Sequence, residues 1–245
     1  MNDAPPPFTT RRTLLAGMAL IAVTGALPAR AEQSQAMNVV LLGDSIFDNK
    51  AYVGDGPDVI AQLRAALPSG ASATLAARDG ATTSDIAGQL AAMPKDATHL
   101  IVSVGGNDAL QEKGLIEESA RSVAEVLDKL AKIKAAFRKS YATMLDGVVA
   151  RKLPAAVCTI YEARYQDPTT RAIAATGLSV FNDVILREAF ARGLPVIDLR
   201  LIFNDDADYA NDIEPSVKGG AKLVKVIASL VTTADFKQRR SVIYA

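Results

Sequence analysis

The 245-residue chain has a single cysteine, and this scarcity limits how its fold is stabilised. Cys158 has no partner in the chain, so no internal disulfide can form even in an oxidising compartment. It lies inside the apolar segment AAVCTI, which favours a buried, unreactive role. The fold must therefore be stabilised by its core, and a hydrophobic content of 49% makes that feasible.

The chain also lacks a surplus of charge of either sign. It has 27 Lys and Arg residues and 27 Asp and Glu residues. The first 31 residues hold three of the basic residues (Arg11, Arg12 and Arg30) and one acidic residue (Asp3), which leaves 24 basic and 26 acidic residues and a net charge of −2. Without a basic surplus to neutralise phosphates, the sequence argues against a nucleic-acid-binding protein.

The apolar segment near the N-terminus is only 14 residues long (14–27), too short to span a bilayer comfortably. It follows the paired arginines and precedes the small-residue site at 29–31. This order predicts a signal peptide of the twin-arginine (Tat) type over residues 1–31 and one α/β domain over 32–245. We expect export to the periplasm or the medium, with no stable membrane span after cleavage. An uncleaved membrane anchor is the alternative.

Short apolar runs alternate along the rest of the chain with longer amphipathic patterns. Near-continuous apolar character within the runs indicates strands that are covered on both faces. Strand–helix alternation implies a parallel sheet with helices on both faces, so we predict an α/β fold with five parallel strands. The predicted strands, each with the turn that follows, are 37–45, 72–80, 99–108, 154–162 and 194–200. The predicted helices are about 57–67, 84–93, 116–150, 170–192 and 216–232.

The predicted helix 116–150 has an amphipathic stripe along its whole length. A stripe of this kind is far more typical of core packing than of a partner-binding groove, so we expect it to face the core. Its members are Ile116, Val123, Leu127, Leu130, Phe137, Tyr141 and Leu145.

Residues with catalytic potential follow three of the predicted strands, at the edge where ligands bind in parallel sheets. The first strand is followed by GDS (43–45), whose Ser45 is exposed on a tight turn for attack on a carbonyl, although such a tripeptide is also an ordinary turn and cap. Gly80 follows the second strand and can turn its N–H toward a ligand, or simply complete a turn. The third strand is followed by GGND, in which Asn107 offers a neutral amide donor to an oxyanion and Asp108 can brace it or cap the next segment.

Together, GDSI, Gly80 and GGND, with the PS of the later segment NDIEPS, resemble the SGNH/GDSL hydrolase family over essentially the whole chain after residue 31. The resemblance implies a flavodoxin-like three-layer α/β/α sandwich and ester hydrolysis through an acyl-serine. It implies that Ser45 is the nucleophile. The backbone N–H groups of Ser45 and Gly80 and the side chain of Asn107 would form the oxyanion hole. No metal or organic cofactor is implied.

The final block departs from the family pattern. The family has Asp-x-x-His, often followed by Pro-Ser, whereas this chain has Asn211 at the aspartate position and Glu214 at the histidine position. The only histidine, His99, is predicted at the amino end of the third strand, roughly 20 Å from the catalytic edge of the sheet. A Ser-His-Asp triad is therefore excluded unless a partner chain supplies the histidine.

Three interpretations of Glu214 follow. In the first, its carboxylate replaces imidazole as the base toward Ser45, which requires a pocket that raises its pKa from about 4.3. Asn211 would then donate a hydrogen bond to that carboxylate, where an aspartate would repel it. In the second, Glu214 and Pro215 begin a helix, and the helix dipole lowers the pKa of Glu214. In the third, the site is inactive and binds its ligand without cleaving it.

The acidic segment before Glu214, residues 204–214, does not fit a calcium-binding EF-hand loop. Tyr209 and Pro215 stand where such a loop needs glycine and glutamate, so we expect a solvated acidic loop instead. After the fourth strand, YEARY (161–165) lies near the same edge of the sheet, but its spacing specifies no role.

The sequence thus predicts an exported esterase that acts on an ester of a small acyl group carried by a carbohydrate or a lipid. Ser45 would attack the carbonyl while Glu214 removes its proton, directly or through a water. One alternative is a catalytically inactive protein that binds an acylated glycan or peptide. Another is an acyltransferase, which passes the acyl group to an alcohol.

Overall fold

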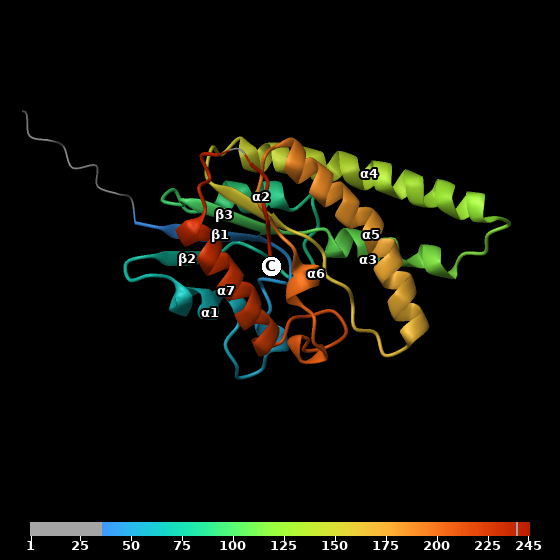
Figure 1. The fold of residues 1–245 in the computed structure, drawn as a ribbon, viewed down its shortest axis with the longest axis horizontal. Coiled ribbons are helices and arrows are strands. Elements are labelled where there is room, and N and C mark those ends of the chain that lie inside the picture. Colours follow the sequence, from blue (N-terminus) through green and yellow to red (C-terminus); the bar gives the residue numbers. More distant parts are fainter. Residues whose placement is uncertain (1–35, 239) are drawn as a thin grey trace, which may run out of the picture. The chain divides into compact units, whose positions relative to one another are not determined.

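Six parallel strands form the central sheet, in the order β2-β1-β3-β4-β5-β6 (Figure 1). The computed structural model describes residues 36–238 and 240–245, so the predicted signal peptide lies outside the described residues. The five predicted strands are present, and the predicted number of strands is wrong by one. The additional strand, β6, has only two residues, too few for a recognisable sequence pattern. The strands are β1 (Asn38–Gly43), β2 (Ser72–Leu75), β3 (His99–Ser103), β4 (Ala155–Cys158), β5 (Val196–Ile197) and β6 (Ile243–Tyr244).

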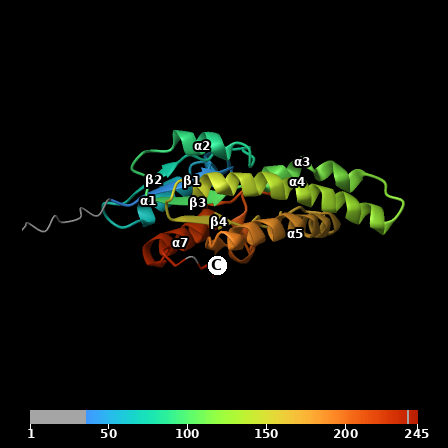
Figure 2. The same cartoon turned by 90° about the horizontal axis from the view of Figure 1, so that it is seen from above.

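Helices cover both faces of the sheet, which gives the predicted three layers (Figure 2). Side chains alternate between the faces along β1: Val39 and Leu41 pack against one helical layer, and Val40 and Leu42 pack against the other. The first layer consists of α1 (Val59–Ala66), α6 (Leu199–Ile202) and α7 (Val217–Thr233). The second consists of α2 (Ile86–Ala92), α4 (Val123–Val149) and α5 (Pro168–Ala191).

The five predicted helices correspond to α1, α2, α4, α5 and α7, with small shifts of their ends. Several shorter helical elements were not predicted, since a few residues carry too little periodicity to be detected. They are η1 (Lys50–Tyr52), α3 (Gly106–Gln111), η2 (Lys113–Glu117), α6 and η3 (Asp206–Asp208). Within the described ranges, no helix is both long enough and apolar enough to cross a membrane.

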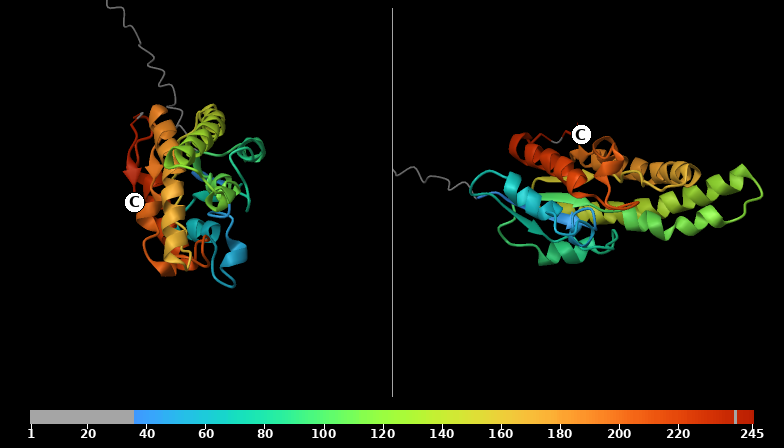
Figure 3. Two further views of the ribbon diagram at one scale, coloured as in Figure 1. Left: turned by 90° about the vertical axis from the view of Figure 1, so that its right-hand side faces the viewer. Right: turned by 90° about the horizontal axis from the view of Figure 1, so that it is seen from below.

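One part of the chain extends beyond the sheet: α3, η2 and the N-terminal halves of α4 and α5, which we call the distal arm (Figures 1 and 3). The expectation that the whole stripe of residues 116–150 faces the core is wrong for this part. Phe137, Tyr141 and Leu145 are buried, whereas Val123 and Leu127 are 76% and 59% exposed. Ile116, in η2, is also exposed. The helix continues past the end of the sheet, so its first half has no layer to pack against.

Candidate active site

Ser45 lies on the turn that follows β1, as predicted, but the expectation that it is exposed is wrong, because the residue is 8% exposed. The strand before it ends at a position that requires glycine. Gly43 ends β1 with a φ of +138°, and a Cβ at this position would lie 1.8 Å from the carbonyl oxygen of Ser103 in β3. Only glycine therefore fits. The side-chain amide of Gln89 accepts from the Gly43 N–H and donates to its carbonyl, both at 2.8 Å. Among the described residues, the N–H of Ser45 has no hydrogen-bond partner, so it is free to bind a ligand.

Two further loops meet Ser45 at the carboxyl edge of the sheet, between β1 and β3, where the strand order reverses. Gly80, after β2, has a φ of +78° and open space where a side chain would be. Asn107, in the first turn of α3, donates one amide hydrogen to the carbonyl of Ala81 at 2.9 Å, which leaves the second for a ligand. The two loops are tied together because Asp108 accepts from the N–H (3.1 Å) and the hydroxyl (2.6 Å) of Thr83.

Glu214 is the residue that the structure brings to Ser45. Its side chain is buried, with the residue 5% exposed, and the Ser45 hydroxyl is close enough to its carboxyl group to affect the pKa of that group. Its Oε2 atom has no hydrogen-bond partner in the part of the chain that the structure describes. Burial raises the pKa of Glu214, the Ser45 hydroxyl offsets part of that rise, and the negative charge of Asp79 adds to it. The pKa of this carboxyl therefore lies above its usual range.

The alternative in which Glu214 and Pro215 begin a helix is wrong. Helix α7 begins at Val217, and Ser216 caps it by accepting a hydrogen bond from the N–H of Gly219 at 3.2 Å. Pro215 instead pairs with Tyr209 in an isolated β-bridge. Because the hydroxyl of Ser216 does the capping, the Glu214 carboxylate is left to face Ser45.

Asn211 does not have the predicted role of a donor to the Glu214 carboxylate. Its side-chain oxygen accepts from the N–H of Ile213 (2.9 Å) and the N–H of Glu214 (2.8 Å). This is a tight turn of the Asx type, in which the side chain of an asparagine binds the backbone that follows it. Asn211 therefore shapes the loop that presents Glu214 and leaves the carboxylate itself uncovered.

His99 lies at the amino ends of the strands, away from the carboxyl ends that Ser45 follows, as predicted. It begins β3 opposite Val39, near the amino end of β1, whereas Ser45 follows the carboxyl end of that strand. Its ring packs edge-on against Phe236 at 5.5 Å, and its Nδ1 lies 2.9 Å from the hydroxyl of Thr98. This histidine cannot reach Ser45.

Two buried groups beside Glu214 were not assigned a role by sequence reasoning. Asp44 is 3% exposed, and its pKa is raised to about 8 by burial and by the negative charges of Glu214 and Asp108, against a hydrogen bond from the Ile46 N–H. Tyr161 donates its hydroxyl hydrogen to the carbonyl of Ile213, in the Glu214 loop. The only sequence signal for either was its place directly after a strand.

The acidic segment 204–214 differs from the predicted solvated loop at two acidic residues, because Asp208 is buried as well as Glu214. Asp208 is fully buried and accepts from the Lys222 ammonium at 2.6 Å and from the N–H groups of Asn204 and Asp205 at 3.1 and 3.0 Å. Lys222, 14 positions later in the sequence, thus replaces solvent. In the described ranges, no group of three or more His, Cys, Asp or Glu side chains is arranged to hold a metal ion.

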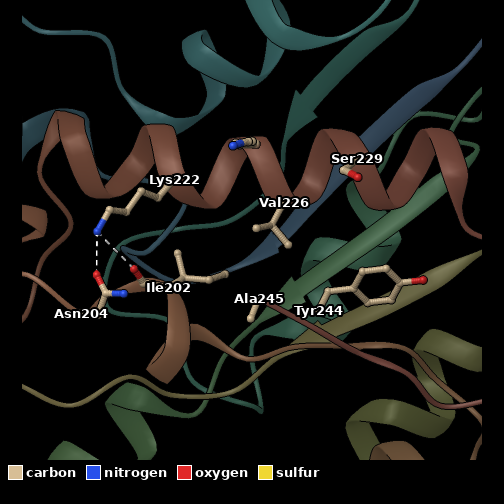
Figure 4. A pocket seen from close by; sticks show the side chains of 8 residues that line it. Ile202, Asn204, Lys222, Val226, Ser229, Tyr244 and Ala245 are labelled. Carbon is tan, nitrogen blue, oxygen red and sulfur yellow. Dashed lines mark hydrogen bonds between the residues drawn. The ribbon is translucent and has the colours of Figure 1, made fainter.

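A pocket at the C-terminal edge of the sheet lies apart from Ser45 and Glu214 (Figure 4). It is lined by α7, α6 and the end of the chain, including Val226 and Tyr244. The Lys222 ammonium at its rim already binds Asn204 Oδ1 at 2.9 Å and the Ile202 carbonyl at 3.5 Å. The pocket contains none of the predicted catalytic residues, so we do not assign it to the candidate active site.

Comparisons with known proteins show a family and related folds. A model of the GDSL-like lipase/acylhydrolase family matches residues 41–222. No curated protein matches the chain. Among solved structures, an extracellular lipase from Streptomyces rimosus is 20% identical, with a TM-score of 0.59 over 79% of this chain and 99% of that one. A phospholipase A1 from Streptomyces albidoflavus NA297 is 20% identical, with a TM-score of 0.58 over 79% and 99%. The acetyl xylan esterase AlAXEase is 16% identical, with a TM-score of 0.59 over 80% and 100%.

Proposed function

The chain belongs to the GDSL-like lipase/acylhydrolase family, and on that premise we propose that it hydrolyses carboxylic esters through an acyl intermediate on Ser45. The observation that carries the proposal is a buried glutamate with an unpartnered carboxylate oxygen, placed close enough to the Ser45 hydroxyl for that hydroxyl to affect its pKa. Similar structures include a lipase, a phospholipase and an acetyl xylan esterase, which supports an ester as the substrate. The substrate we favour is an ester of a small acyl group.

In the acylation step, Ser45 Oγ attacks the ester carbonyl carbon while its proton moves to the Glu214 carboxylate. The carbonyl oxygen becomes negatively charged in the tetrahedral intermediate. We assign its stabilisation to the N–H groups of Ser45 and Gly80 and to the Asn107 amide. The intermediate then collapses, the bond to the alcohol oxygen breaks, and Glu214 returns the proton to that oxygen.

Deacylation repeats these steps with water as the nucleophile. Glu214 takes a proton from the water, whose oxygen attacks the acyl carbon, and the bond to Ser45 Oγ breaks. The proton returns to Ser45, and the carboxylic acid leaves. One residue thus transfers the proton in both directions, which is the role of histidine in a Ser-His-Asp triad.

The environment of Glu214 suits this role. An exposed glutamate is a weak base because its pKa lies far below neutrality, and burial without a counter-charge raises that pKa toward the working pH. Because only the ionised carboxylate accepts the Ser45 proton, kcat/KM should rise with pH through the raised pKa of Glu214. The acidic limb of the pH profile should therefore lie above the usual glutamate range.

The first experiment measures hydrolysis of an activated acetyl ester and labelling by a fluorophosphonate. We expect Ser45→Ala to abolish labelling and to lower kcat/KM by about 10³-fold or more. We expect Glu214→Gln to lower kcat/KM by about 10²- to 10⁴-fold, the usual contribution of a general base. A wild-type protein that neither labels nor exceeds Ser45→Ala would instead be a binding protein for an acylated glycan or peptide.

A matched control is available in Glu188→Gln, which changes another buried glutamate that lies in α5 away from the carboxyl edge of β1. The folded fraction of this variant should keep the wild-type kcat/KM. If Glu214→Gln keeps full activity, Glu214 is not the general base, but the proposal that the protein is a hydrolase still stands. Adding an alcohol acceptor and measuring the new ester separates hydrolysis from acyl transfer.

We also propose that the protein is exported, because of the twin-arginine pattern at residues 11–12 and the small-residue site at 29–31. Fractionation of the native host should then place the shortened chain outside the cytoplasm.

A further inference from the structure

Beside Ser45 and Glu214, two loops form a rim that carries negative charge and one phenol ring. Asp48 lies on the turn after β1, Tyr52 ends η1, and Asp79 directly precedes Gly80 on the loop after β2. The Tyr52 hydroxyl donates to Asp79 Oδ2 at 2.7 Å, and the Asp79 N–H donates to Asp48 Oδ2 at 3.0 Å. These bonds fix the three residues as one group, which we call the acidic rim.

The acidic rim forms no ion pair in the described part of the chain, although Arg78 directly precedes Asp79 in the sequence. Of the ion pairs found in residues 36–238 and 240–245, none includes Asp48, Asp79 or Glu214. The nearest lysine in the sequence, Lys50, donates instead to the carbonyls of Gly54 (2.8 Å) and Gly56 (3.0 Å). The rim is partly exposed, so solvent and ligands reach it.

The negative charge of the acidic rim raises the pKa values of neighbouring groups. The pKa of Tyr52 is raised to about 12, first by its hydrogen bond to Asp79 and then by burial and the negative charges of Glu214, Asp79 and Asp48. The pKa of Glu214 is raised by burial and by Asp79. Tyr52 therefore stays neutral at physiological pH, and its ring remains available to a cation.

A second observation points to a ligand at the same place. Glu214 is 5% exposed, and its Oε2 has no hydrogen-bond partner among the described residues, while the nearby Ser45 hydroxyl acts on the pKa of the carboxyl group. A buried carboxylate oxygen without a partner is costly, and a ligand that occupies the site can supply one. The acidic rim is near enough to Glu214 for Asp79 to raise the pKa of Glu214, so it lies beside the proposed nucleophile.

We propose that the acidic rim of Asp48, Tyr52 and Asp79 is a subsite for a positively charged group, a primary or quaternary ammonium, carried by the ester substrate. Carboxylates attract the charge and the Tyr52 ring offers its face to it. The same field repels anionic esters, so the site discriminates by charge in both directions. This inference rests on the proposed ester hydrolysis and specifies its substrate class.

The test uses pairs of esters that differ only in one charge. Acetylcholine and its neutral isostere 3,3-dimethylbutyl acetate place the group on the alcohol side, and betaine methyl ester and methyl 3,3-dimethylbutanoate place it on the acyl side. Each kcat/KM is divided by the rate of hydroxide hydrolysis of the same ester. At about 20 mM ionic strength, the cationic member of one pair should be preferred about tenfold or more, and about 0.5 M salt should remove most of the preference. The preferred pair identifies the side of the ester that carries the ammonium.

Variants assign the preference to the acidic rim. Asp79→Asn and Asp48→Asn should each reduce the preference by about threefold or more, measured as the ratio within a pair. Asp128→Asn makes the same change of net charge on α4, where Asp128 pairs with Lys132, and should leave the ratio unchanged. Equal rates within both pairs, or a preference that survives both rim variants, would overturn the proposal.

A binding measurement separates failure of this inference from failure of the proposed hydrolysis. Ser45→Ala is titrated with choline or with 3,3-dimethylbutanol while the Tyr52 ring signals, assigned with Tyr52→Phe, are followed by NMR. Choline should shift these signals at concentrations where the neutral alcohol does not. If no ester is hydrolysed and choline still binds, the subsite stands without the hydrolase. If neither ligand shifts Tyr52, the subsite is rejected.

Discussion

Two buried glutamates of this protein have opposite environments. Glu188, in α5, is 6% exposed and accepts charged hydrogen bonds from Arg138 and Arg192, both at 2.7 Å. Glu214 is 5% exposed, has only the neutral Ser45 hydroxyl acting to lower its pKa, and keeps one oxygen without a partner in the described chain. Burial alone would raise the pKa of both. The two arginines bring the pKa of Glu188 below its usual range, whereas the pKa of Glu214 stays above it.

The same contrast holds for two buried aspartates. Burial acts to raise the pKa of Asp198, but hydrogen bonds from Arg200 and Thr159 bring it below the usual range. Asp44, next to Ser45, has only negative neighbours, and its pKa is raised to about 8. Paired buried acids in this molecule connect helices and loops, while unpaired ones gather at the edge of the sheet where a ligand would bind. Unpaired buried charge costs stability, so its concentration at one place indicates function.

The strongest test of this contrast is to neutralise each glutamate and measure stability. Glu188→Gln removes a paired charge and should lower the free energy of unfolding by about 2 kcal/mol, mostly through Arg192, because the Arg138 side chain is 66% exposed and screened by water. Glu214→Gln removes an unpaired charge and should leave the free energy of unfolding unchanged or raise it. Urea denaturation near pH 7 measures both.

The two variants should also differ in their dependence on pH. The pKa of Glu188 is lower in the folded protein than in the unfolded chain. Its contribution to the free energy of unfolding is therefore present above the unfolded-state pKa and is lost as the pH falls through the folded-state pKa. The difference between wild type and Glu188→Gln should therefore shrink below about pH 4. Equal losses of stability in the two variants at neutral pH would contradict the contrast.

A smaller effect is expected from Asp44. Because its folded-state pKa is about 8, the folded protein retains a proton that the unfolded chain has released, and stability should fall as the pH rises from about 4 toward 8. Between about pH 5 and pH 9, wild type should lose more than about 1.4 kcal/mol, the equivalent of one pKa unit. Asp44→Asn should lose less over the same range. A loss of equal size in both proteins would show that another group is responsible.

The smallest expected effect concerns the support of the Glu214 loop. Tyr161→Phe removes the hydrogen bond to the Ile213 carbonyl, so we expect about 1 kcal/mol less stability and about a three- to tenfold lower kcat/KM. Because Tyr161 positions the loop that carries Glu214, the acidic limb of the pH profile, which reports the pKa of Glu214, should also move. Tyr141→Phe is the matched control, because the buried Tyr141 hydroxyl has no partner among the described residues. A similar response of both variants would show a packing effect alone.

Much of the fold was predictable because its signals are local. The apolar runs of β1, β2 and β3 predicted three parallel strands, and so they placed Ser45, Gly80 and Asn107 after the carboxyl ends of those strands. The position of His99 at the far edge followed from the same pattern, since one strand length separates the two edges.

Most of what could not be predicted depends on contacts between segments that are separate in the sequence, and the turn at Asn211 is a local exception. The two residues of β6 become a strand only because β5 is beside them. Asp208 looks solvated in sequence, but Lys222, 14 positions later, makes its burial feasible. Asn211 seemed to face the carboxylate, and the geometry of its turn directs its oxygen to the backbone instead. In each case the partner, and not the residue itself, decides the outcome.

The distal arm has a consequence for how the protein opens. None of residues 106–136 is buried, so little apolar contact holds this segment closed once its helical hydrogen bonds break. Its amide hydrogens should exchange with solvent through local openings, at far lower free energies than those of β1 and β3. Asn107 lies at the root of this segment, held by the bond to Ala81 while Asp108 holds Thr83. Asn107, which we assign as a donor to the oxyanion, should therefore lie at the boundary between a segment whose amide hydrogens exchange quickly and strands whose amide hydrogens exchange slowly.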